Sequence, residues 1–579
     1  MSEQNPTLIG RVTSVLGATI TVALEPDLAG VSPIWNGQLH NVGQIGTTVA
    51  LPQGTSKLLG SVTRLSLTQL TTSDNSVSEL GPPDLRSIEV QLTGEIDALG
   101  VFHRGVANHP GIDDPVHFVS GEDLISIYPK PDATNLAIGA LSANRSIPVS
   151  VNLGKLVMRH SVVVGSTGAG KSSIVAALLQ GIERGPWPSA NVVVIDSHGE
   201  YKASAGTETA RIDFASATHP VLPAWMLPAV DILAVYTQGP PSVTVREKFA
   251  SLVADARRAF ARDADWITIP EEEINSDTPI PFDLREVWFE LDTANRRTHS
   301  DTAKTQDALV SDGDAQTLTS SVFEPYKAGS VLPNKGAEHG NFGTIPDQIR
   351  RSLTEPRLAF LGIGDLVEAK ANDPLPSIVT SLLGDQKRIS LLDISGIPSD
   401  VANFAVGIVL NVLFELSWRG REDGIGRNNP VLIVVEEAHR YFNDTSSSHL
   451  AKTYVDRISR EGRKYGIGVM LVTQRPSELP KTALSQVGTI VALRLNNDSD
   501  QATIAAALPD GIAGIAQMLP ALRTGEAIIT GEALPIPSRV VLRTPNPWPS
   551  GTDPGIDAWT KEPKSVDVTE SIQRWRLNK

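Results

Sequence analysis

The segment from Gly165 to Ser172, with the letters GSTGAGKS, has the residue types and spacing of a loop that binds nucleotide phosphates. Its glycines let backbone N–H groups turn onto phosphate oxygens, and the positive N-terminal end of a following helix faces the same anion. In this pattern Lys171 reaches the terminal phosphates and the Ser172 hydroxyl binds Mg2+. An apolar run precedes the loop and a helical pattern follows it, which disfavours a glycine-rich turn that binds nothing. The residues predicted to hold ATP in this segment are Gly165, Thr167, Gly168, Ala169, Gly170, Lys171, Ser172 and Ser173.

Hydrolysis of a bound triphosphate requires carboxylates for Mg2+ and for the attacking water. The apolar run Val431 to Val435 ends in Glu436 and Glu437, so we assign Glu436 to the metal and Glu437 to the water. Asp393 is the competing candidate, because it ends another apolar run. The Glu pair is favoured, since two adjacent acids are needed and the residues that follow Asp393 offer no second one.

Two further acids, Asp196 and Glu200, follow the apolar run 191–195 within the segment DSHGEY. They would lie at the carboxyl edge of a parallel sheet, where open α/β folds bind their ligands. On these residues alone, a place in the nucleotide site and a solvated loop are equally supported. His198 by itself does not indicate a metal site.

A basic cluster comprises Arg457, Arg460, Arg463 and Lys464, and its spacing of three puts the arginines near one helical face. Such a charge run is ordinarily a solvated surface. Because the cluster directly precedes a strand that ends just before Gln474, we expect it near the nucleotide edge of the sheet. There an Arg could reach a γ-phosphate on a neighbouring subunit and neutralise charge that grows in the transition state. Gln474 could sense whether that phosphate is present.

The elements that must position these residues form a doubly wound α/β core. Continuous apolar runs are typical of strands that are buried on both faces of a parallel sheet. The predicted strands are 161–164, 191–195, 389–393, 431–435, 468–473 and 489–493. Helical patterns between them include 172–183 and 401–419.

The rest of the chain differs from this core in its patterning. Short β-branched runs at the start predict a small antiparallel β-barrel. Amphipathic stretches in the middle predict helices, although residues 299–345 look loosely ordered. The predicted parts are the barrel over 1–130, the core over 131–214 and 386–545, a helical insertion over 215–385 and a C-terminal arm over 546–579.

The composition excludes several classes of protein. The chain has 579 residues with 41% hydrophobic and 20% charged residues, which is typical of a globular protein. With no Cys it can form no disulfide, thiolate zinc site or iron–sulfur cluster. A formal charge of -15 argues against a surface that coats nucleic acid, but it permits a local basic channel. The N-terminus lacks a signal pattern and no stretch stays apolar for about 18 residues, which predicts a cytoplasmic protein.

Together these residues resemble the HerA branch of the HerA/FtsK ATPases. The resemblance covers about residues 1–545. Its motifs are GSTGAGKS from Gly165, DSHGEY from Asp196, EEAH from Glu436, REGRK from Arg460 and TQRP from Thr473. One departure is Ser197, where the family often has Pro. Because both acids of that loop are retained, the change concerns the stiffness of the loop more than catalysis.

The resemblance implies a RecA-like P-loop ATPase core that assembles into a hexamer, hydrolyses ATP with Mg2+ and pumps double-stranded DNA through a central channel. It further implies that Asp196 and Glu200 lie in the nucleotide site, that Glu437 is catalytic, and that Arg463 or Arg460 acts on a neighbouring subunit. A few pore-facing Lys or Arg, repeated around a ring, can hold phosphates although the total charge is acidic. The candidate pore segments are the stretch after Asp213 and the stretch Asn496 to Asp500.

The function predicted in this way is an ATP-driven hexameric double-stranded DNA translocase or helicase, with a NurA-like nuclease docked on the N-terminal barrel. The alternative is a ring-shaped ATPase scaffold that regulates an antiphage defence effector, such as a sirtuin-like NAD-degrading enzyme or a nuclease. A secretion or conjugation ATPase of the same superfamily is less favoured, because no membrane segment precedes the motor. The first two functions use the same residues, so the identity of the partner would separate them.

Overall fold

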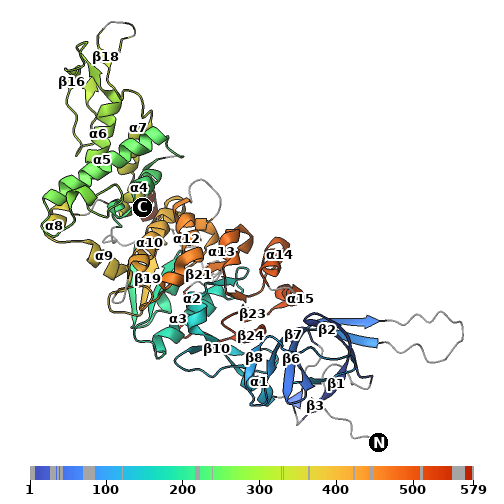
Figure 1. Ribbon diagram of the computed structural model, residues 1–579. Coiled ribbons are helices and arrows are strands. Elements are labelled where there is room, and N and C mark those ends of the chain that lie inside the picture. Colours follow the sequence, from blue (N-terminus) through green and yellow to red (C-terminus); the bar gives the residue numbers. More distant parts are fainter. Residues whose placement is uncertain are drawn as a thin grey trace, which may run out of the picture.

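The chain folds into three bodies that follow one another in space (Figure 1). The N-terminal barrel lies at one end, the α/β core in the middle and the helical insertion at the opposite end. The computed structural model describes residues 7–26, 34–35, 38–39, 44–68, 85–119, 121–214, 222–237, 239–327, 329, 332–362, 365–420, 424–442, 449–508, 513–550 and 568–576. The predicted pore stretch directly after Asp213 lies mostly outside these residues.

The barrel consists of six antiparallel strands that close because β2 pairs with both β1 and β7. Buried and exposed positions alternate along β2, so one face fills the barrel interior and the other meets solvent. The closed strands are β1 (Leu8–Leu16), β2 (Thr19–Leu24), β5 (Thr48–Gln53), β6 (Ser56–Thr68), β7 (Leu85–Ile96) and β9 (Pro115–Phe118). Strand β8 (Phe102–Arg104) extends β7, β3 (Ile34–Trp35) pairs with β4 (Gln38–Leu39), and the short helix α1 (Gly121–Ile127) follows the barrel.

Polar contacts attach the barrel region to the core. The buried Tyr128 hydroxyl is 2.6 Å from Ser538 Oγ, and Arg104 Nη1 donates to the carbonyl of Gly531 at 3.1 Å. Gly514 lies so close to β6 that a Cβ there would come within 2.6 Å of the Thr63 carbonyl. The barrel therefore rests on the last two strands of the core and on the helices that precede them.

The core is one sheet of eleven strands in the order β11-β10-β24-β23-β22-β12-β21-β20-β13-β19-β14. The strands from β22 to β14 are parallel, and β23, β24, β10 and β11 extend the sheet in antiparallel fashion. The core strands are β10 (Asn135–Leu141), β11 (Pro148–Asn152), β12 (Ser161–Val164), β13 (Asn191–Asp196), β14 (Thr209–Asp213), β19 (Ile389–Asp393), β20 (Val431–Val435), β21 (Ile467–Thr473), β22 (Thr489–Ala492), β23 (Glu526–Gly531) and β24 (Ser538–Leu542). The six predicted strands are confirmed within one residue at each end, whereas the antiparallel extension was not predicted.

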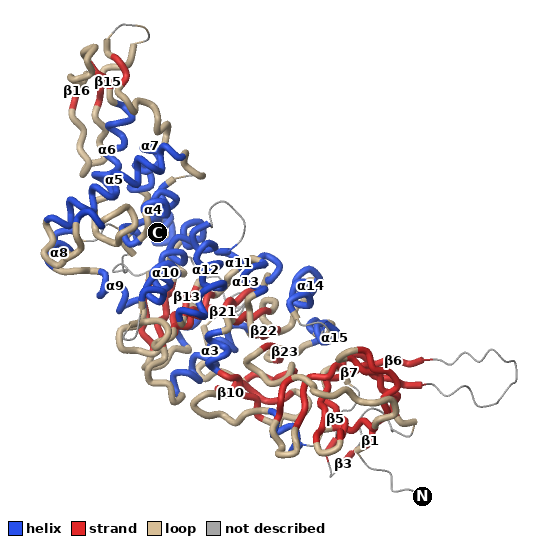
Figure 2. The backbone as a smooth tube through the Cα atoms, in the orientation of Figure 1, coloured by secondary structure: helices blue, strands red, loops and turns tan. Residues whose placement is uncertain are grey.

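Helices cover both faces of the parallel part (Figure 2). Neighbouring residues of β12 belong to different hydrophobic clusters, because Val162 and Val164 pack on one face and Val163 on the other. The face of Val163 is covered by α2 and α3, and the opposite face by α10 and α12. These helices, with the shorter ones near them, are α2 (Leu153–Met158), α3 (Lys171–Arg184), α10 (Ser399–Arg419), α11 (His439–Phe442), α12 (His449–Tyr465), α13 (Lys481–Ser485), α14 (Asp498–Ala507) and α15 (Ala513–Ala516).

One helix within the described residues, α10, is long and apolar enough to cross a membrane by length and composition, in contrast to the expectation of no such segment. In the fold, 78% of its apolar window is buried, with Leu410 and Leu413 fully enclosed. This burial is typical of a core helix.

The insertion is built around α5 (Val243–Arg262) and α6 (Leu284–Arg296), each capped at its start by a side chain, from Ser242 and Asp283 respectively. The remaining helices are α4 (Ala229–Tyr236), α7 (Ile345–Leu353), α8 (Leu366–Ala371) and α9 (Leu375–Leu382). The tip carries two strand pairs, β15 (Thr298–His299) with β18 (Asn334–Lys335) and β16 (Leu309–Ser311) with β17 (Val322–Phe323). The prediction of loose order over 299–345 is therefore wrong for these strands, which are too short to give a sequence signal.

The predicted arm begins by packing on the core. Gln180 of α3 accepts a hydrogen bond from the Asn546 N–H at 2.8 Å and donates one to the Pro547 carbonyl at 2.8 Å. The Ser550 N–H then donates to the Glu200 carbonyl at 2.7 Å. Residues 551–567 lie outside the described residues, and the exposed helix α16 (Thr569–Arg576) follows them.

Candidate nucleotide site

The loop 165–170 connects the buried strand β12 to the start of α3, and its backbone adopts the conformation that an anion cradle needs. Gly168 and Gly170 have φ of 72° and 108°, which side chains with a Cβ rarely adopt. A Cβ at Gly165 would come within 2.9 Å of the Leu493 side chain. The N–H groups of Gly168, Gly170 and Lys171 donate no hydrogen bond to other described residues. They are therefore available to phosphate oxygens.

Lys171 is the first residue of α3 and is only 8% exposed. Within the described part of the chain, no carboxylate lies within ion-pair distance of its ammonium group. A buried cation without a counter-charge is costly, so this arrangement favours a bound anion. The structure thus gives Lys171 the surroundings that phosphate binding requires.

Asp196, at the end of β13, is a buried acceptor of backbone hydrogen bonds. Its carboxylate accepts from the N–H groups of His198 and Glu200 at 3.2 Å each and from Tyr201 at 3.0 Å. Burial raises the pKa of Asp196, although these three donors favour the charged form. Asp196 therefore fixes the loop that carries Glu200, as well as contributing negative charge at this edge of the sheet.

Glu436 directly follows β20, and its carboxylate is close enough to Asp196 for the two negative charges to repel each other. Its Oε1 accepts a hydrogen bond from the hydroxyl of Tyr201, and burial raises the pKa of Glu436 to about 8. Asp196 and Glu437 add repulsion that acts in the same direction. A divalent cation would reverse this cost, because it favours the charged carboxylate.

Glu437 has φ of 48°, a left-handed conformation that is unusual for a residue with a long side chain. Such conformations persist where the surrounding fold imposes them, and they cluster at functional sites. The carboxylate is 13% exposed, and its Oε2 lies 3.2 Å from Nδ1 of His439. The competing acid, Asp393, is engaged locally, because its Oδ1 accepts from the N–H and hydroxyl of Ser395 at 3.0 and 2.6 Å.

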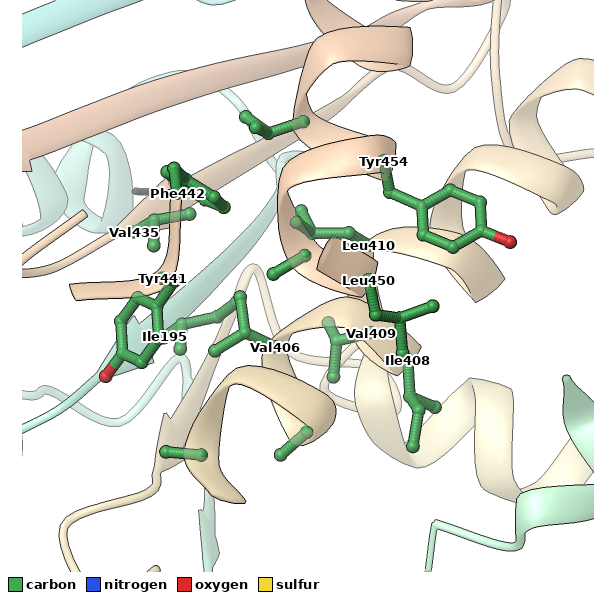
Figure 3. Packing of buried hydrophobic residues seen from close by; sticks show 14 of the residues in the cluster. Ile195, Val406, Ile408, Val409, Leu410, Val435, Tyr441, Phe442, Leu450 and Tyr454 are labelled. Carbon is green, nitrogen blue, oxygen red and sulfur yellow. The ribbon is translucent and has the colours of Figure 1, made fainter. Parts of the chain in front are cut away.

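Hydrophobic packing fixes the ends of the two strands that carry these acids. Figure 3 shows Ile195 and Val435, which directly precede Asp196 and Glu436, packed with Tyr441 and Phe442 of α11. All four are almost fully buried. The acids are therefore held by strand ends that have little freedom to move.

Gln474 lies beside the phosphate loop, as its predicted role as a phosphate sensor requires. Its Oε1 accepts a hydrogen bond from Thr167 Oγ1 at 2.7 Å. The predicted pore segment from Asn496 also meets the loop, because the Asn496 N–H donates to Ser166 Oγ at 3.2 Å. Both contacts lie at the carboxyl edge of the sheet.

The predicted position of the arginine cluster is wrong. Helix α12 ends at Tyr465, and the Val431 N–H at the start of β20 donates to the carbonyl of the next residue, Gly466, at 2.9 Å. This is the amino edge of the parallel strands, opposite the phosphate loop. The seven residues of β21 separate the two edges by about 20 Å. The cluster precedes β21 in the sequence, so it lies near the start of that strand. The phosphate loop lies at the opposite end, where β21 finishes.

The three arginines of the cluster also differ from one another. Arg457 forms an ion pair with Glu415 at 2.9 Å and lies 4.3 Å from the centre of the Phe414 ring, so it is part of the packing between α12 and α10. Arg460 and Arg463 are exposed and form no ion pair with any described residue. Both lie in the last two turns of α12, which ends at the amino edge of the sheet.

The residues present fit a magnesium ion. Mg2+ prefers oxygen ligands and is usually held by one or two carboxylates together with substrate phosphates and water. The Ser172 hydroxyl and the Glu436 carboxylate are ligands of this kind, and a cation here would offset the repulsion that Glu436 receives from Asp196 and Glu437. Among the described residues, no group of three or more His, Asp or Glu side chains could hold a metal by itself.

Two family models match the part of the chain that carries this site. The model of the HerA helicase central domain matches residues 136–413, and that of the HerA-like C-terminal domain matches residues 384–546. The chain belongs to the HerA helicase family. The two matches together contain the phosphate loop, all the acids described above and both exposed arginines of α12.

Individual HerA-family proteins are similar over most of the chain. The DNA double-strand break repair helicase HerA of Sulfolobus acidocaldarius is 25% identical over 474 residues, 80% of each chain. A probable helicase of Methanocaldococcus jannaschii is 23% identical over 415 residues, 71% of this chain and 70% of its own. The solved structure of VirB4 of Thermoanaerobacter pseudethanolicus covers 72% of this chain and 97% of its own, with 13% identity and a TM-score of 0.47, a likeness too weak to bear on function.

Sequence reasoning missed three residues of this HerA-family site. Tyr201 donates to Glu436, while His439 and Thr473 contact each other at 3.0 Å close to Glu437. Each of the three belongs to a motif in which the sequence analysis assigned a role only to neighbouring residues. Tyr201 and His439 are polar side chains two to five residues beyond a buried acid, and this spacing was the available signal.

Proposed function

We propose that the chain is an ATP-driven translocase on double-stranded DNA that works as a hexameric ring with nucleotide bound between neighbouring copies. The observation that carries the proposal is the set of groups at the carboxyl edge of the sheet. A buried Lys171, with no ion-pair partner among the described residues, follows a loop with left-handed glycines, and the acids Asp196, Glu436 and Glu437 lie at strand ends on the same edge.

In this proposal the phosphate loop and Lys171 bind the β- and γ-phosphates of ATP, and Ser172 and Glu436 hold Mg2+. Mg2+ when bound neutralises negative charge on the phosphates as the bond to the leaving group breaks. Glu437 accepts a proton from the attacking water and orients it toward the γ-phosphorus. Tyr201, whose N–H donates to Asp196, keeps Glu436 in place through its hydroxyl.

Arg460 or Arg463 completes the site from a neighbouring copy. Support comes from their position in the last two turns of α12, which ends at the edge opposite the phosphate loop, and neither has an ion-pair partner among the described residues. An arginine that reaches a neighbour's γ-phosphate makes hydrolysis dependent on assembly. A ring built in this way couples each hydrolysis event to the contact between two copies.

The HerA family and its repair helicases support DNA as the track. Binding through phosphates is expected to be independent of sequence and to weaken steeply as salt rises. We also propose that the N-terminal barrel docks a separate nuclease or effector. The barrel exposes large apolar side chains, including Leu16 and Leu99 at 82% and 88%, that a docked partner would cover.

Complementation within mixed rings tests the shared site. Glu437→Gln removes the water-polarising acid, and the double variant Arg460→Ala/Arg463→Ala removes both candidate arginines, so rings of either variant alone are expected to be inactive. When the two variants are mixed before assembly, about a quarter of the seams combine an intact Glu437 with an intact arginine. ATP turnover should therefore reappear in the mixture.

Two results would contradict the proposal. Full turnover by Glu437→Gln alone would show that Glu437 does not activate the water. No recovery in mixed rings, with mixing verified by mass measurement of the assembly, would show that the arginines do not serve a neighbour. A salt titration of duplex DNA binding with two unrelated sequences checks the predicted track separately.

A further inference from the structure

A chain of contacts connects the phosphate loop to Glu437 through two residues that have no role in the function proposed so far. Thr473 ends β21, and its carbonyl accepts a hydrogen bond from the N–H of Gly165, the first residue of the loop, at 3.3 Å. The next residue, Gln474, accepts one from Thr167 in the middle of the loop at 2.7 Å. The end of β21 is thus attached to the phosphate loop at two points.

The same strand end is attached to the acid. The fully buried Thr473 hydroxyl lies 3.0 Å from Nδ1 of His439, and that Nδ1 lies 3.2 Å from Oε2 of Glu437. Oε2 is buried and forms no hydrogen bond with a described residue, so its 3.2 Å contact with His439 Nδ1 is a close approach at ion-pair distance. A buried carboxylate oxygen without a hydrogen bond is costly, so a small change in the position of His439 changes how well Glu437 is held.

The nearby carboxylate favours a proton on Nδ1 of the neutral imidazole. Thr473 Oγ1 already accepts from the N–H of Arg475 at 3.0 Å and has a second lone pair available. An Nδ1–H can therefore be donated to Thr473 Oγ1 at 3.0 Å while it faces Glu437 Oε2 at 3.2 Å. The opposite tautomer would bring an Nδ1 lone pair against the carboxylate. Burial lowers the pKa of His439, in agreement with a neutral ring that has one N–H to donate.

We propose that His439 is a positioning residue for Glu437, and that Thr473 connects this contact to the phosphate loop. A nucleotide that orders the loop also orders Gln474 and Thr473, and through the Nδ1–H of His439 it orders the carboxylate that activates the water. The coupling works within one chain, unlike the arginine from the neighbouring copy. The inference rests on the proposed role of Glu437 as the acid that activates the water.

The matched pair Thr473→Val and Thr473→Ser tests the inference in the full-length assembly. Valine has nearly the shape of threonine and keeps the β-branched packing of the strand, whereas serine keeps the hydroxyl. Thr473→Val is expected to lower kcat for ATP about 10-fold to 100-fold, because a small misplacement of a catalytic group has effects of this size. The KM and the dissociation constant for ATP with Mg2+ should stay near wild type, and Thr473→Ser should retain most of the turnover.

His439 supplies the second pair. His439→Asn puts an N–H donor near the place of Nδ1, whereas His439→Phe has a ring but no donor. The Asn variant is expected to keep a larger kcat than the Phe variant, again without a change in ATP affinity. If His439→Phe fails to fold, as judged by thermal melting and assembly, the Thr473 pair still decides the question.

The possible results separate this inference from the function on which it rests. If Glu437→Gln is inactive but Thr473→Val and His439→Phe hydrolyse ATP at the wild-type rate, the positioning role is wrong and the catalytic role of Glu437 stands. If Glu437→Gln itself keeps full turnover, both are wrong. A rise in kcat for either variant would also overturn the inference, because His439 would then restrain Glu437 instead of positioning it.

Discussion

The two edges of the parallel sheet carry opposite charges in opposite surroundings. At the carboxyl edge, Asp196 and Glu436 are buried, with 1% and 6% of their surface exposed, and are held by hydrogen bonds. At the amino edge, Arg460 and Arg463 are exposed and have no described partner. In the proposed function, one chain carries both halves of a hydrolytic site at opposite edges of its sheet, which the seven residues of β21 separate by about 20 Å. On that proposal, the difference teaches that assembly, rather than folding alone, brings the halves together.

The largest expected effect comes from the exposed edge. Arg463→Ala and Arg460→Ala are compared one at a time, and the variant that removes the arginine facing the neighbour's γ-phosphate is expected to lose about 10³-fold in kcat. ATP binding should persist, because both residues lie far from the phosphate loop of their own chain. Steady-state ATPase measurements on the assembled ring of each variant give the kcat values to compare. Lys464→Ala, an exposed cation of the same turn, is the control, and a loss of similar size there would indicate a general charge effect.

The acids of the buried edge give the next largest effect. Glu437→Gln is expected to lower kcat by about 10²-fold or more, the usual contribution of a general base, while nucleotide binding is retained. Asp393→Asn is the matched control, because Asp393 ends a neighbouring parallel strand but is engaged with Ser395. It should stay close to wild type. An Asp393→Asn variant as inactive as Glu437→Gln would reverse the choice between the two acids.

Burial of Glu436 gives a pH effect on stability that the exposed edge lacks. Its folded-state pKa is raised from 4.5 to about 8, so the folded protein prefers the protonated acid. The contribution of protonated Glu436 to the free energy of unfolding is fully present below about pH 4.5 and is lost as pH rises through about 8. Without nucleotide and metal, Glu436→Gln should therefore melt at a higher temperature than wild type at pH 8 to 9, and the difference should shrink toward pH 5. A constant difference across this range would show that Glu436 does not titrate as described.

The smallest expected effect distinguishes Arg457 from the other two arginines of α12. Arg457 contacts Glu415 and the Phe414 ring, so Arg457→Ala should cost about 1 kcal/mol of stability through lost packing. Turnover per folded assembly should remain near wild type. Thermal melting and ATPase measurements on the same preparation check both parts. A large loss of kcat without a change in melting would place Arg457 with Arg460 and Arg463.

The phosphate loop, the acid pair and six of the seven parallel strands were predictable because each signal is local. Four to six consecutive apolar residues are required wherever a strand is buried on both faces, and Gly168 and Gly170 are required wherever the backbone turns with positive φ. The antiparallel strands β23 and β24 were missed. Their runs are short and no helix lies between the two strands, so they lack the strand–helix alternation of the parallel part. Only their pairing with β22 and β10 identifies them as part of this sheet.

The position of the basic cluster was mispredicted for a related reason. In a parallel α/β fold a helix returns the chain to the amino edge, so a residue just before a strand lies far from the ligand edge. The contacts of Tyr201, His439 and Thr473 were also beyond the sequence. They join residues that are 235 and 34 positions apart, and nothing local encodes which buried polar groups will meet.

The sequence by itself determined that this chain has a nucleotide-binding α/β core with an acid pair at a strand end, because short-range backbone geometry and burial impose those residues. Only the tertiary structure decided which polar groups surround each acid, and on which edge of the sheet the arginines lie. The physical reason is that hydrogen bonds and distances across the sheet depend on strand order and helix direction, which link residues far apart in the chain.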